Sequence, residues 1–382
     1  MQKNKNILIV SGEASGDLHA SELVSAIKET DPEIAFFGLG GDRSKEAGVN
    51  LYHNMVELAV VGFWEVLKNL KKIRRVFDGL LQETDKVKPD LAILIDYPGF
   101  NLRLAVQLKK RNIPVVYYIS PQIWAWGKKR VHAIKKIVDL MLVVFQFEEE
   151  LYKENNIPVS FVGHPLLDIV KTKRSKTEFF SGLGFDPAVF TIALLPGSRE
   201  KEVKNLLAVM LESASLIEKR SKNRLQFLIL RAPSVEEGIF KDILNKYDLN
   251  TRLVSDMTYD GVASCDFAMV CSGTATLETA ILGIPMVILY KVSFLTWAYM
   301  KLLIKIPYIG LVNVVKKRKI IPEFIQYGAN PKKIADCIVS LMKDPKKLSG
   351  LRRELQGIPA QLGEKGASKK AAQEIIRFLK LA

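Results

Sequence analysis

Short apolar runs alternate with helix-length segments through the first 162 residues, and no other feature constrains the fold as strongly. The runs are rich in isoleucine and valine, as strands are when helices cover both faces of a parallel sheet. The expected strands lie at residues 7–10, 34–37, 91–95, 115–119, 140–144 and 159–162. The pattern predicts an α/β domain built on a parallel sheet.

The alternation restarts after a polar, lysine-rich segment at residues 171–190, which is expected to connect two domains. Further strands are expected at residues 191–195, 226–230, 267–270 and 285–289. At 382 residues, the chain is longer than one typical domain. We therefore expect two Rossmann-like halves in tandem, with the active site in the cleft between them. The last segment, 366–382, has helical spacing and is expected to form a packing helix.

The charge of the chain indicates an anionic partner. The net charge is +15 and the isoelectric point is about 9.5, which suits nucleic acid, anionic lipid or a phosphorylated substrate. The basic residues stand beside apolar residues rather than in an aromatic-interleaved groove, and no nucleic-acid reader motif occurs. No nucleic-acid partner is therefore expected.

Cysteine usage and hydropathy favour a cytoplasmic protein. The three cysteines, Cys265, Cys271 and Cys337, lack metal-ligand spacing and are expected to be core residues in a reducing compartment. The first apolar run is only one strand long, so no signal peptide is expected. No stretch of about 18 uncharged apolar residues occurs, so no transmembrane helix is expected either.

The loop at residues 12–17 joins the first expected strand to a helix and carries two carboxylates. Its small residues let a ligand approach the backbone N–H groups at the start of the helix. Asp17 suits a helix N-cap, whereas Glu13 has no such structural need. Carboxylates repel a diphosphate, and the dinucleotide fingerprint is absent. This loop is therefore expected to bind hydroxyl groups, such as those of a sugar.

Two loops of the second half favour a nucleoside diphosphate site. Gly197 and Ser198 can present backbone N–H groups, and Arg199 can bind phosphate bidentately. Residues 272–274 open a later helix with small hydroxyl residues and glycine, and Glu278 one turn on can accept hydrogen bonds from a ribose diol. The alternatives are an ordinary turn with a solvated arginine and a plain capping motif.

Asp96 follows the expected strand at residues 91–95, at the end where open α/β sheets bind ligands. A partly buried carboxylate there could have a raised pKa and act as a general base. The alternative is a helix cap or turn residue. Trp124 and Trp126 follow the next strand and could stack on a sugar, pack an acyl chain or pack in the core.

A basic and apolar stretch at residues 56–77 suits the surface of an anionic bilayer. The alternative is a core helix with a solvated basic face. A similar stretch spans residues 292–319. The side chains expected to face the membrane are Val60, Phe63, Trp64, Leu67, Lys68, Lys71 and Lys72.

Several blocks of sequence, taken together and in order, resemble the lipid-A-disaccharide synthase family of bacterial glycosyltransferases. The resemblance covers nearly the whole chain. The matching blocks lie at residues 11–17, 40–42, 120–126, 163–166, 195–199, 272–278 and 322–326.

The resemblance implies a GT-B fold, in which two Rossmann-like domains face each other across a cleft and the C-terminal helix packs back on the first. The expected acceptor-side domain comprises residues 1–168 and 355–382, and the expected UDP-sugar domain comprises residues 169–354. The enzyme would be cytoplasmic and peripheral on the inner membrane. Its donor would be UDP-2,3-diacylglucosamine and its acceptor 2,3-diacylglucosamine 1-phosphate. The products would be a β-1,6-linked disaccharide 1-phosphate and UDP. Whether the chain forms a homodimer stays open.

The resemblance also implies roles for single residues. Asp96 matches the family's proposed catalytic base and Arg199 its phosphate-site arginine, while Glu13 stays an alternative candidate for the base. The other expected substrate contacts are Ser15, Asp17, Gly197, Ser198, Ser272, Gly273, Thr274, Glu278, Asn313, Glu323 and Gln326.

The expected reaction is a single inverting displacement, in which Asp96 takes the proton of the acceptor's 6-hydroxyl. The sequence has no D-x-D triplet that would call for a divalent cation, so neither metal nor cofactor is expected. The alternative function is that of another UDP-sugar enzyme of the same architecture, such as a UDP-N-acetylglucosamine 2-epimerase or the lipid-linked muramyl transferase.

Overall fold

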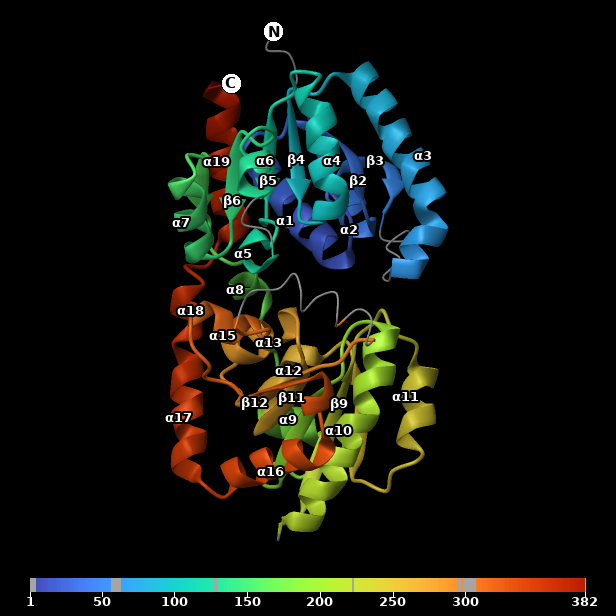
Figure 1. The fold of residues 1–382 in the computed structure, drawn as a ribbon, viewed down its shortest axis with the longest axis vertical. Coiled ribbons are helices and arrows are strands. Elements are labelled where there is room, and N and C mark those ends of the chain that lie inside the picture. The colour runs from blue at the N-terminus through green and yellow to red at the C-terminus, as the bar shows by residue number, and fades with distance from the viewer. Residues whose placement is uncertain are drawn as a thin grey trace. The chain divides into compact units, whose positions relative to one another are not determined.

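The computed structural model describes residues 5–55, 63–126, 130–221, 223–293, 297 and 307–381, with the backbone alone at 63–70, 125 and 126. The chain forms two compact units (Figure 1). The first comprises Met1–Pro165 and Leu362–Ala382, and the second comprises Leu166–Gln361. The first unit thus ends three residues before the expected boundary. The chain returns to the first unit only at Leu362, later than the expected residue 355, because helix α17 (Pro345–Gln356) packs on helices of the second unit.

The first unit contains a parallel sheet in the order β3-β2-β1-β4-β5-β6-β7. In β1 and β4 every residue except Asn6 is buried, which explains the unbroken apolar runs. Strand β3 was not expected from the sequence, because it is a half-exposed edge strand with polar residues. The strands are β1 (Asn6–Ser11), β2 (Ala35–Gly40), β3 (Val49–Asn54), β4 (Leu91–Ile95), β5 (Val115–Tyr118), β6 (Leu140–Val143) and β7 (Val159–Phe161).

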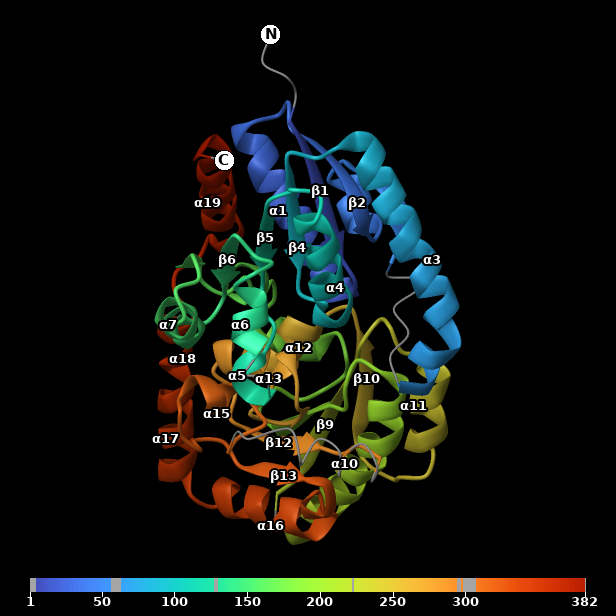
Figure 2. The same cartoon turned by 45° about the horizontal axis from the view of Figure 1, so that its top comes forward.

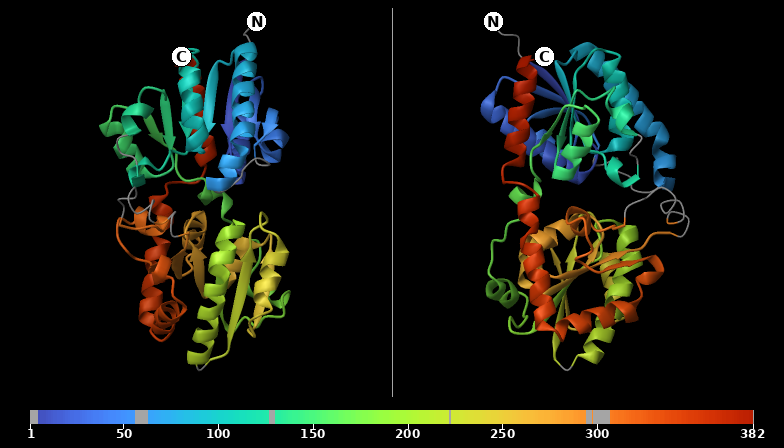
Figure 3. Two further views of the ribbon diagram at one scale, coloured as in Figure 1. Left: turned by 45° about the vertical axis from the view of Figure 1, so that its right-hand side comes forward. Right: turned by 60° about the vertical axis from the view of Figure 1, so that its left-hand side comes forward.

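Helices cover both faces of this sheet (Figure 3). The C-terminal helix α19 lies beside α1 (Figures 1 and 2), where Lys5 Nζ donates to the Leu379 carbonyl at 2.7 Å. This contact confirms the predicted return of the tail to the first unit. The helices are α1 (Ala14–Thr30), α2 (Asp42–Glu46), α3 (Phe63–Val87), α4 (Pro98–Lys109), α5 (Ile123–Trp126), α6 (Val131–Ile134), α7 (Gln146–Glu154) and α19 (Ala367–Leu381).

Helix α3 corrects part of the predicted membrane face. Val76 and Leu80 are buried in the core of the first unit, and the Phe77 ring lies 5.2 Å from that of Phe100. The apolar side chains at the end of the basic and apolar stretch at residues 56–77 therefore pack inward, while Lys71 and Lys72 are exposed. Val60 lies outside the described residues, as do the side chains of Phe63, Trp64, Leu67 and Lys68.

The second unit repeats the architecture with a parallel sheet in the order β10-β9-β8-β11-β12-β13. Its strands are β8 (Phe190–Leu195), β9 (Leu225–Arg231), β10 (Thr251–Ser255), β11 (Phe267–Cys271), β12 (Met286–Tyr290) and β13 (Glu323–Ile325). Its helices are α8 (Leu166–Ile169), α9 (Lys176–Ser181), α10 (Glu200–Arg220), α11 (Glu237–Leu244), α12 (Thr258–Ser264), α13 (Thr274–Ile281), α15 (Leu311–Val315), the short η2 (Gln326–Gly328), α16 (Pro331–Met342), α17 and α18 (Ile358–Gln361).

The polar segment at residues 171–190 is more than a connection. It contains α9, whose N-cap Ser175 accepts a hydrogen bond from the backbone of Glu178. Phe179 and Phe180 are fully buried, and α9 packs on α12. The polar residues of the segment are its solvated face, and its few aromatic residues decide where it lies.

Burial of the cysteines follows the expectation in part. Cys265 and Cys271 are buried, whereas Cys337 is half-buried. None of the helices that the structure describes is long and apolar enough to cross a membrane.

Candidate active site

Glu13 and Asp96 lie at the carboxyl ends of two neighbouring strands of the first unit. β1 pairs with β4 in parallel, and Ser11 is in register with Ile95. From β1 the chain continues to β2 on one side, while β4 lies on the other side. Such a reversal of strand order opens a crevice for a ligand at the carboxyl edge of a sheet.

The backbone holds Asp96 in an uncommon conformation. Asp96 and Tyr97 have φ angles of 45° and 47°, in the left-handed region that non-glycine residues rarely adopt. The Asp96 carbonyl accepts hydrogen bonds from Asn101 Nδ2 at 2.8 Å and from the Tyr117 hydroxyl at 2.5 Å. These two side-chain donors hold the backbone turn that carries Asp96.

The environment of Asp96 makes its carboxylate more basic than usual. Burial raises the pKa of Asp96 to about 6, and the negative charge of Glu13 adds to this effect. A hydrogen bond from the Tyr97 backbone opposes the shift. A carboxylate with a pKa near 6 is mostly ionised at neutral pH and is a stronger base than a solvated aspartate.

Tyr97 joins the two strand ends and was not foreseen from the sequence. A Cβ atom on Gly12 would lie 2.3 Å from Tyr97 Cγ, so this position requires glycine because the tyrosine ring occupies the space. The Tyr97 ring stacks on Phe100 with a centroid distance of 5.8 Å. Burial and the charge of Glu13 raise the pKa of Tyr97.

Asp17 has a structural role, which corrects its assignment as an N-cap of α1 and as a substrate contact. Glu13 occupies the N-cap position of α1. Asp17 is 4% exposed, and it accepts hydrogen bonds from Gly41 N at 2.7 Å, Ser44 N at 3.1 Å and the Ser44 hydroxyl. Its carboxylate therefore caps the start of α2. Ser15, in contrast, is exposed in the first turn of α1.

A second buried carboxylate, Glu148, was also missed. It is 1% exposed and accepts hydrogen bonds from Trp124 Nε1 at 3.0 Å and from Phe145 N at 3.3 Å. Burial raises the pKa of Glu148 to about 8, the hydrogen bonds oppose the shift, and the charge of Asp96 adds to it. Glu148 thus fixes the orientation of the Trp124 indole. The side chain of Trp126 lies outside the described residues.

In the second unit, Glu202 organises the loop after β8. Gly197 has a φ of +124°, and a Cβ atom there would lie 2.5 Å from Glu202 Oε2. The same carboxylate accepts from Ser198 N at 3.1 Å and pairs with Arg199 Nη1 at 3.1 Å. The Ser198 N–H is therefore engaged within the protein, contrary to its expected presentation to a phosphate. The Arg199 side chain is 45% exposed.

The loop after β11 lies beside the loop after β8, because these two strands pair in parallel. Gly273, the N-cap of α13, has a φ of +157°, and no atom lies within 4 Å of where its Cβ would be. Gly273 and Thr274 are exposed, while Ser272 donates to the Ile309 carbonyl at 3.3 Å. Glu278 accepts from the Tyr259 hydroxyl at 3.1 Å. Burial raises the pKa of Glu278, and this hydrogen bond opposes the shift.

Asn313 and Glu323 hold a loop together, which corrects the assignment of Asn313 as a substrate contact, whereas the half-buried Glu323 stays a predicted contact. The Asn313 side chain is fully buried, donating to the Ile321 carbonyl and to Glu323 Oε1, both at 2.8 Å. Its Oδ1 atom accepts from Ile320 N and Ile321 N at 2.8 and 2.9 Å. Glu323 also accepts from Gly310 N at 2.9 Å. These bonds use the polar atoms of Asn313 and fix the start of α15.

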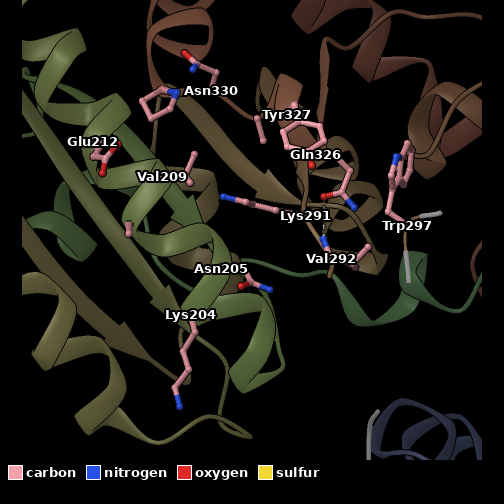
Figure 4. A pocket seen from close by; sticks show the side chains of 13 residues that line it. Lys204, Asn205, Val209, Glu212, Lys291, Val292, Trp297, Gln326, Tyr327 and Asn330 are labelled. Atoms are coloured by element: carbon pink, nitrogen blue, oxygen red, sulfur yellow. Dashed lines mark hydrogen bonds between the residues drawn. The ribbon is translucent and has the colours of Figure 1, made fainter. Parts of the chain in front are cut away.

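Gln326 lines a pocket of about 640 Å³ in the second unit (Figure 4). Its Oε1 atom accepts from Val292 N at 3.3 Å, and its φ of 51° is left-handed. Its buried Nε2 atom has no hydrogen-bond partner among the residues that the structure describes. The lining residues are Lys204, Asn205, Ala208, Val209, Glu212, Lys291, Val292, Trp297, Gln326, Tyr327, Ala329, Asn330 and Pro331.

Comparison with known proteins decides the family. The sequence model of the family described as lipid-A-disaccharide synthetase matches residues 7–376. Lipid-A-disaccharide synthase of Syntrophus aciditrophicus is 46% identical over 378 residues, covering 99% of this chain and 98% of the relative. The chain belongs to the lipid-A-disaccharide synthase family. The enzyme of the same name from Geobacter sulfurreducens is 42% identical, with 98% and 97% covered.

Solved structures support the GT-B fold. The UDP co-structure of S. aureus MnaA has a TM-score of 0.68 at 12% identity, with 99% of this chain and 98% of that chain covered. CalG4, the calicheamicin glycosyltransferase, has a TM-score of 0.63 at 14% identity, with 100% and 99% covered. At these identities the likeness concerns the fold alone. Membership of the lipid-A-disaccharide synthase family makes the chain a glycosyltransferase of lipid A biosynthesis.

For a lipid-A-disaccharide synthase family member, the structure brings the expected residues together in two sets. Glu13, Ser15 and Asp96 lie at the carboxyl edge of the first sheet. The loops at 197–199 and 272–278 lie at the carboxyl edge of the second sheet. Within the described parts of the chain, no group of three or more histidine, cysteine, aspartate or glutamate residues could hold a metal ion.

Proposed function

We propose that the chain transfers diacylglucosamine from UDP-2,3-diacylglucosamine to the 6-hydroxyl of 2,3-diacylglucosamine 1-phosphate. The products are UDP and the β-1,6-linked disaccharide 1-phosphate. Family membership supports the reaction class. The observation that carries the mechanism is Asp96, whose carboxylate combines a pKa of about 6 with a place at the carboxyl edge of the first sheet.

The proposed chemical step is one displacement. Asp96 accepts the proton of the 6-hydroxyl as that oxygen forms a bond to the anomeric carbon of the donor. The bond from the anomeric carbon to UDP breaks, and its electron pair stays on the β-phosphate oxygen. Attack from the face opposite UDP converts an α-linked donor into a β-linked product, so the reaction inverts configuration without a covalent enzyme intermediate.

The second unit would bind the nucleotide of the donor. Arg199 and the N–H groups at the start of α13 offer positive charge and donors to the leaving diphosphate. Glu278 would accept hydrogen bonds from the ribose. Gln326 Nε2, the buried donor without a partner among the described residues, is available to an oxygen of the substrate. These protein groups supply the charge stabilisation that a divalent cation supplies in other enzymes, so the proposal needs no metal.

Helix α3 would bring the enzyme to the anionic inner membrane, where acylated substrates reside. Four cationic side chains on consecutive turns are exposed: Lys71, Lys72, Arg74 and Arg75. Each cation near an anionic bilayer contributes on the order of 1 kcal/mol to attachment. The proposed enzyme is therefore a peripheral protein on the cytoplasmic face of this membrane.

The decisive test is turnover with both diacylated substrates, with and without a metal chelator, following UDP release and disaccharide formation. Disaccharide formed equally in chelator supports the proposal. Consumption of UDP-N-acetylglucosamine in place of the diacylated donor would favour the epimerase alternative. A preparation of Asp96→Asn, purified in the same way, controls for contaminating activity.

A further inference from the structure

A hydrogen bond joins Tyr259 to Glu278 at the carboxyl edge of the second sheet. The Tyr259 hydroxyl donates to Glu278 Oε1 at 3.1 Å. Tyr259 belongs to α12 and Glu278 to α13, and these helices pack against each other. None of the sequence blocks that resemble the family includes Tyr259.

The topology explains why Tyr259 reaches this place. Helix α12 connects β10, at one edge of the sheet, to β11, and the chain must cross over β9 and β8 to make this connection. The helix packs on all three of the strands β8, β9 and β10. Its first turn follows the end of β10 closely, so Tyr259 lies at the same edge of the sheet as the start of α13, the helix that carries Glu278.

Helix α12 is also anchored at its start. Asp260, next to Tyr259, is buried and accepts hydrogen bonds from Lys173 N at 2.6 Å and from Arg174 N at 3.2 Å. Ser264 in the last turn donates to the Asp260 carbonyl at 2.7 Å. Because α12 is fixed in this way, the Tyr259 hydroxyl offers Glu278 a donor in a defined position.

The chemistry of the pair suits recognition of a diol. A carboxylate has acceptor sites on both oxygens, and the tyrosine occupies one site on Oε1. The second oxygen is then left to accept hydrogen bonds from hydroxyl groups of a ligand. Burial favours the neutral form of Glu278, and the Tyr259 hydroxyl favours the ionised form, which accepts hydrogen bonds without donating one.

We propose that Tyr259 is a positioning residue that holds the Glu278 carboxylate for the ribose diol of a uridine nucleotide, so that the site selects ribonucleotides over 2′-deoxyribonucleotides. The inference rests on the proposed function in one respect only, the binding of the nucleotide ribose by Glu278. It adds a residue and a specificity that the family resemblance does not assign.

The test is calorimetric titration of the full-length protein with UDP and with 2′-deoxy-UDP. In Tyr259→Phe, we expect the Kd of UDP to rise about tenfold and the Kd of 2′-deoxy-UDP to change by less than about threefold, because one oriented charge-assisted hydrogen bond is lost. Glu278→Gln should reduce the same preference. Tyr247→Phe is the matched control, since the Tyr247 hydroxyl donates to the Ala208 backbone carbonyl at 3.4 Å and not to a carboxylate of the proposed site.

Steady-state kinetics supply a readout that a purely structural role would not give. In Tyr259→Phe, the KM for the UDP-sugar donor should rise while kcat stays within about twofold of wild type. Equal weakening of both nucleotides, or an unchanged preference, would overturn the role of Tyr259.

The two proposals fail in distinguishable ways. If Glu278→Gln abolishes the ribose preference and Tyr259→Phe retains it, only the role of Tyr259 is wrong. If Glu278→Gln leaves the preference intact, the ribose contact of the proposed function is wrong, and the inference falls with it. If both variants lose the preference but wild type makes no disaccharide, the transferase proposal is wrong and the role of Tyr259 stands.

Discussion

At the scale of single residues, the same side chain takes opposite roles according to its neighbours. Asp96 directly follows β4, and Asp17 lies in the first turns of α1, the helix that follows β1. Asp17 is surrounded by backbone and hydroxyl donors at the start of α2, so its charge is satisfied internally. Asp96 is half-buried, and its partial desolvation and the negative charge of Glu13 both raise its pKa, so its basicity rises. The environment of Asp17 therefore stabilises the fold, and the environment of Asp96 suits a general base.

Glu13→Gln should shift the pH dependence of the reaction. The ionised form of Asp96 is the base, so kcat/KM of wild type should rise as the pH rises through about 6. Removing the negative charge of Glu13 lowers the pKa of Asp96, and the acid limb of the pH profile should therefore move to lower pH. Asp96→Asn should lose roughly 100- to 10,000-fold in kcat above about pH 6, where the wild-type carboxylate is ionised, and the loss should shrink at lower pH. A Glu13→Gln variant as inactive as Asp96→Asn would instead identify Glu13 as the base.

Asp17→Ala should destabilise the protein. The substitution leaves buried donors around the start of α2 without their acceptor, which costs about 2–3 kcal/mol of unfolding free energy. Urea denaturation measures this loss. Asp78→Ala is the control in the same unit, because Asp78 is exposed and its ion pair with Arg74 is long, at 3.8 Å; its effect should stay within about 0.5 kcal/mol. A loss of nucleotide or acceptor binding without destabilisation would show that Asp17 contacts substrate.

The sequence reveals the candidate loops of the site but not the partners within them. Glycines with carboxylate, hydroxyl or arginine side chains after apolar strands mark the segments at residues 12–17, 197–199 and 272–278, and these segments do follow the carboxyl ends of strands. The residues that shape them come from other segments. No local sequence pattern predicts the contacts made by Tyr97, Glu148 and Tyr259. The sequence suggests a binding role for Asn313, but its side chain makes four hydrogen bonds within the protein.

At the scale of elements, burial decides which strands and helices the sequence can predict. Central strands such as β4 and β11 are buried at every position and give unbroken apolar runs. β3 and β13 have largely half-exposed residues and give no such signal. Helix α3 gives a clear helical pattern, but the pattern cannot show which partner its apolar face meets. The structure shows that the described half meets the core.

The exposed cations of α3 yield a prediction at this scale. The double variant Lys71→Glu/Lys72→Glu should lower partitioning onto vesicles containing phosphatidylglycerol by about 10- to 100-fold, since each lysine contributes on the order of 1 kcal/mol. Added salt should weaken wild-type binding in the same direction. Sedimentation with vesicles measures both effects.

The matched control is Lys332→Glu/Lys333→Glu on α16, where both side chains are also exposed. It makes the same change in net charge in the other unit and should leave partitioning unchanged. Equal losses in both double variants would show that only the overall charge of the protein matters, and would contradict a membrane face on α3.

At the scale of the whole molecule, the first unit consists of two segments far apart in the sequence. His164 N donates to the Leu362 carbonyl at 2.8 Å, where the two segments lie side by side. Gly163, with a φ of +87°, lies so close that a Cβ atom would be 3.0 Å from the Glu364 carbonyl oxygen. This approach explains the glycine of the block at residues 163–166, which the sequence alone could assign only by resemblance.

One substitution in the core of each unit can test which of the two units binds the nucleotide. Ile375 of α19 and Ile338 of α16 are both fully buried. Ile375→Ala and Ile338→Ala should each lower the unfolding free energy of their unit by about 2–4 kcal/mol. Because the proposed nucleotide site lies in the second unit, saturating UDP should restore stability lost in Ile338→Ala by mass action. UDP should leave unfolding of the first unit in Ile375→Ala unchanged, and the Kd of UDP for folded Ile375→Ala should match wild type. If UDP instead restored the unfolding free energy of the first unit in Ile375→Ala, the first unit would contribute to nucleotide binding. The assignment of the nucleotide to the second unit would then be wrong.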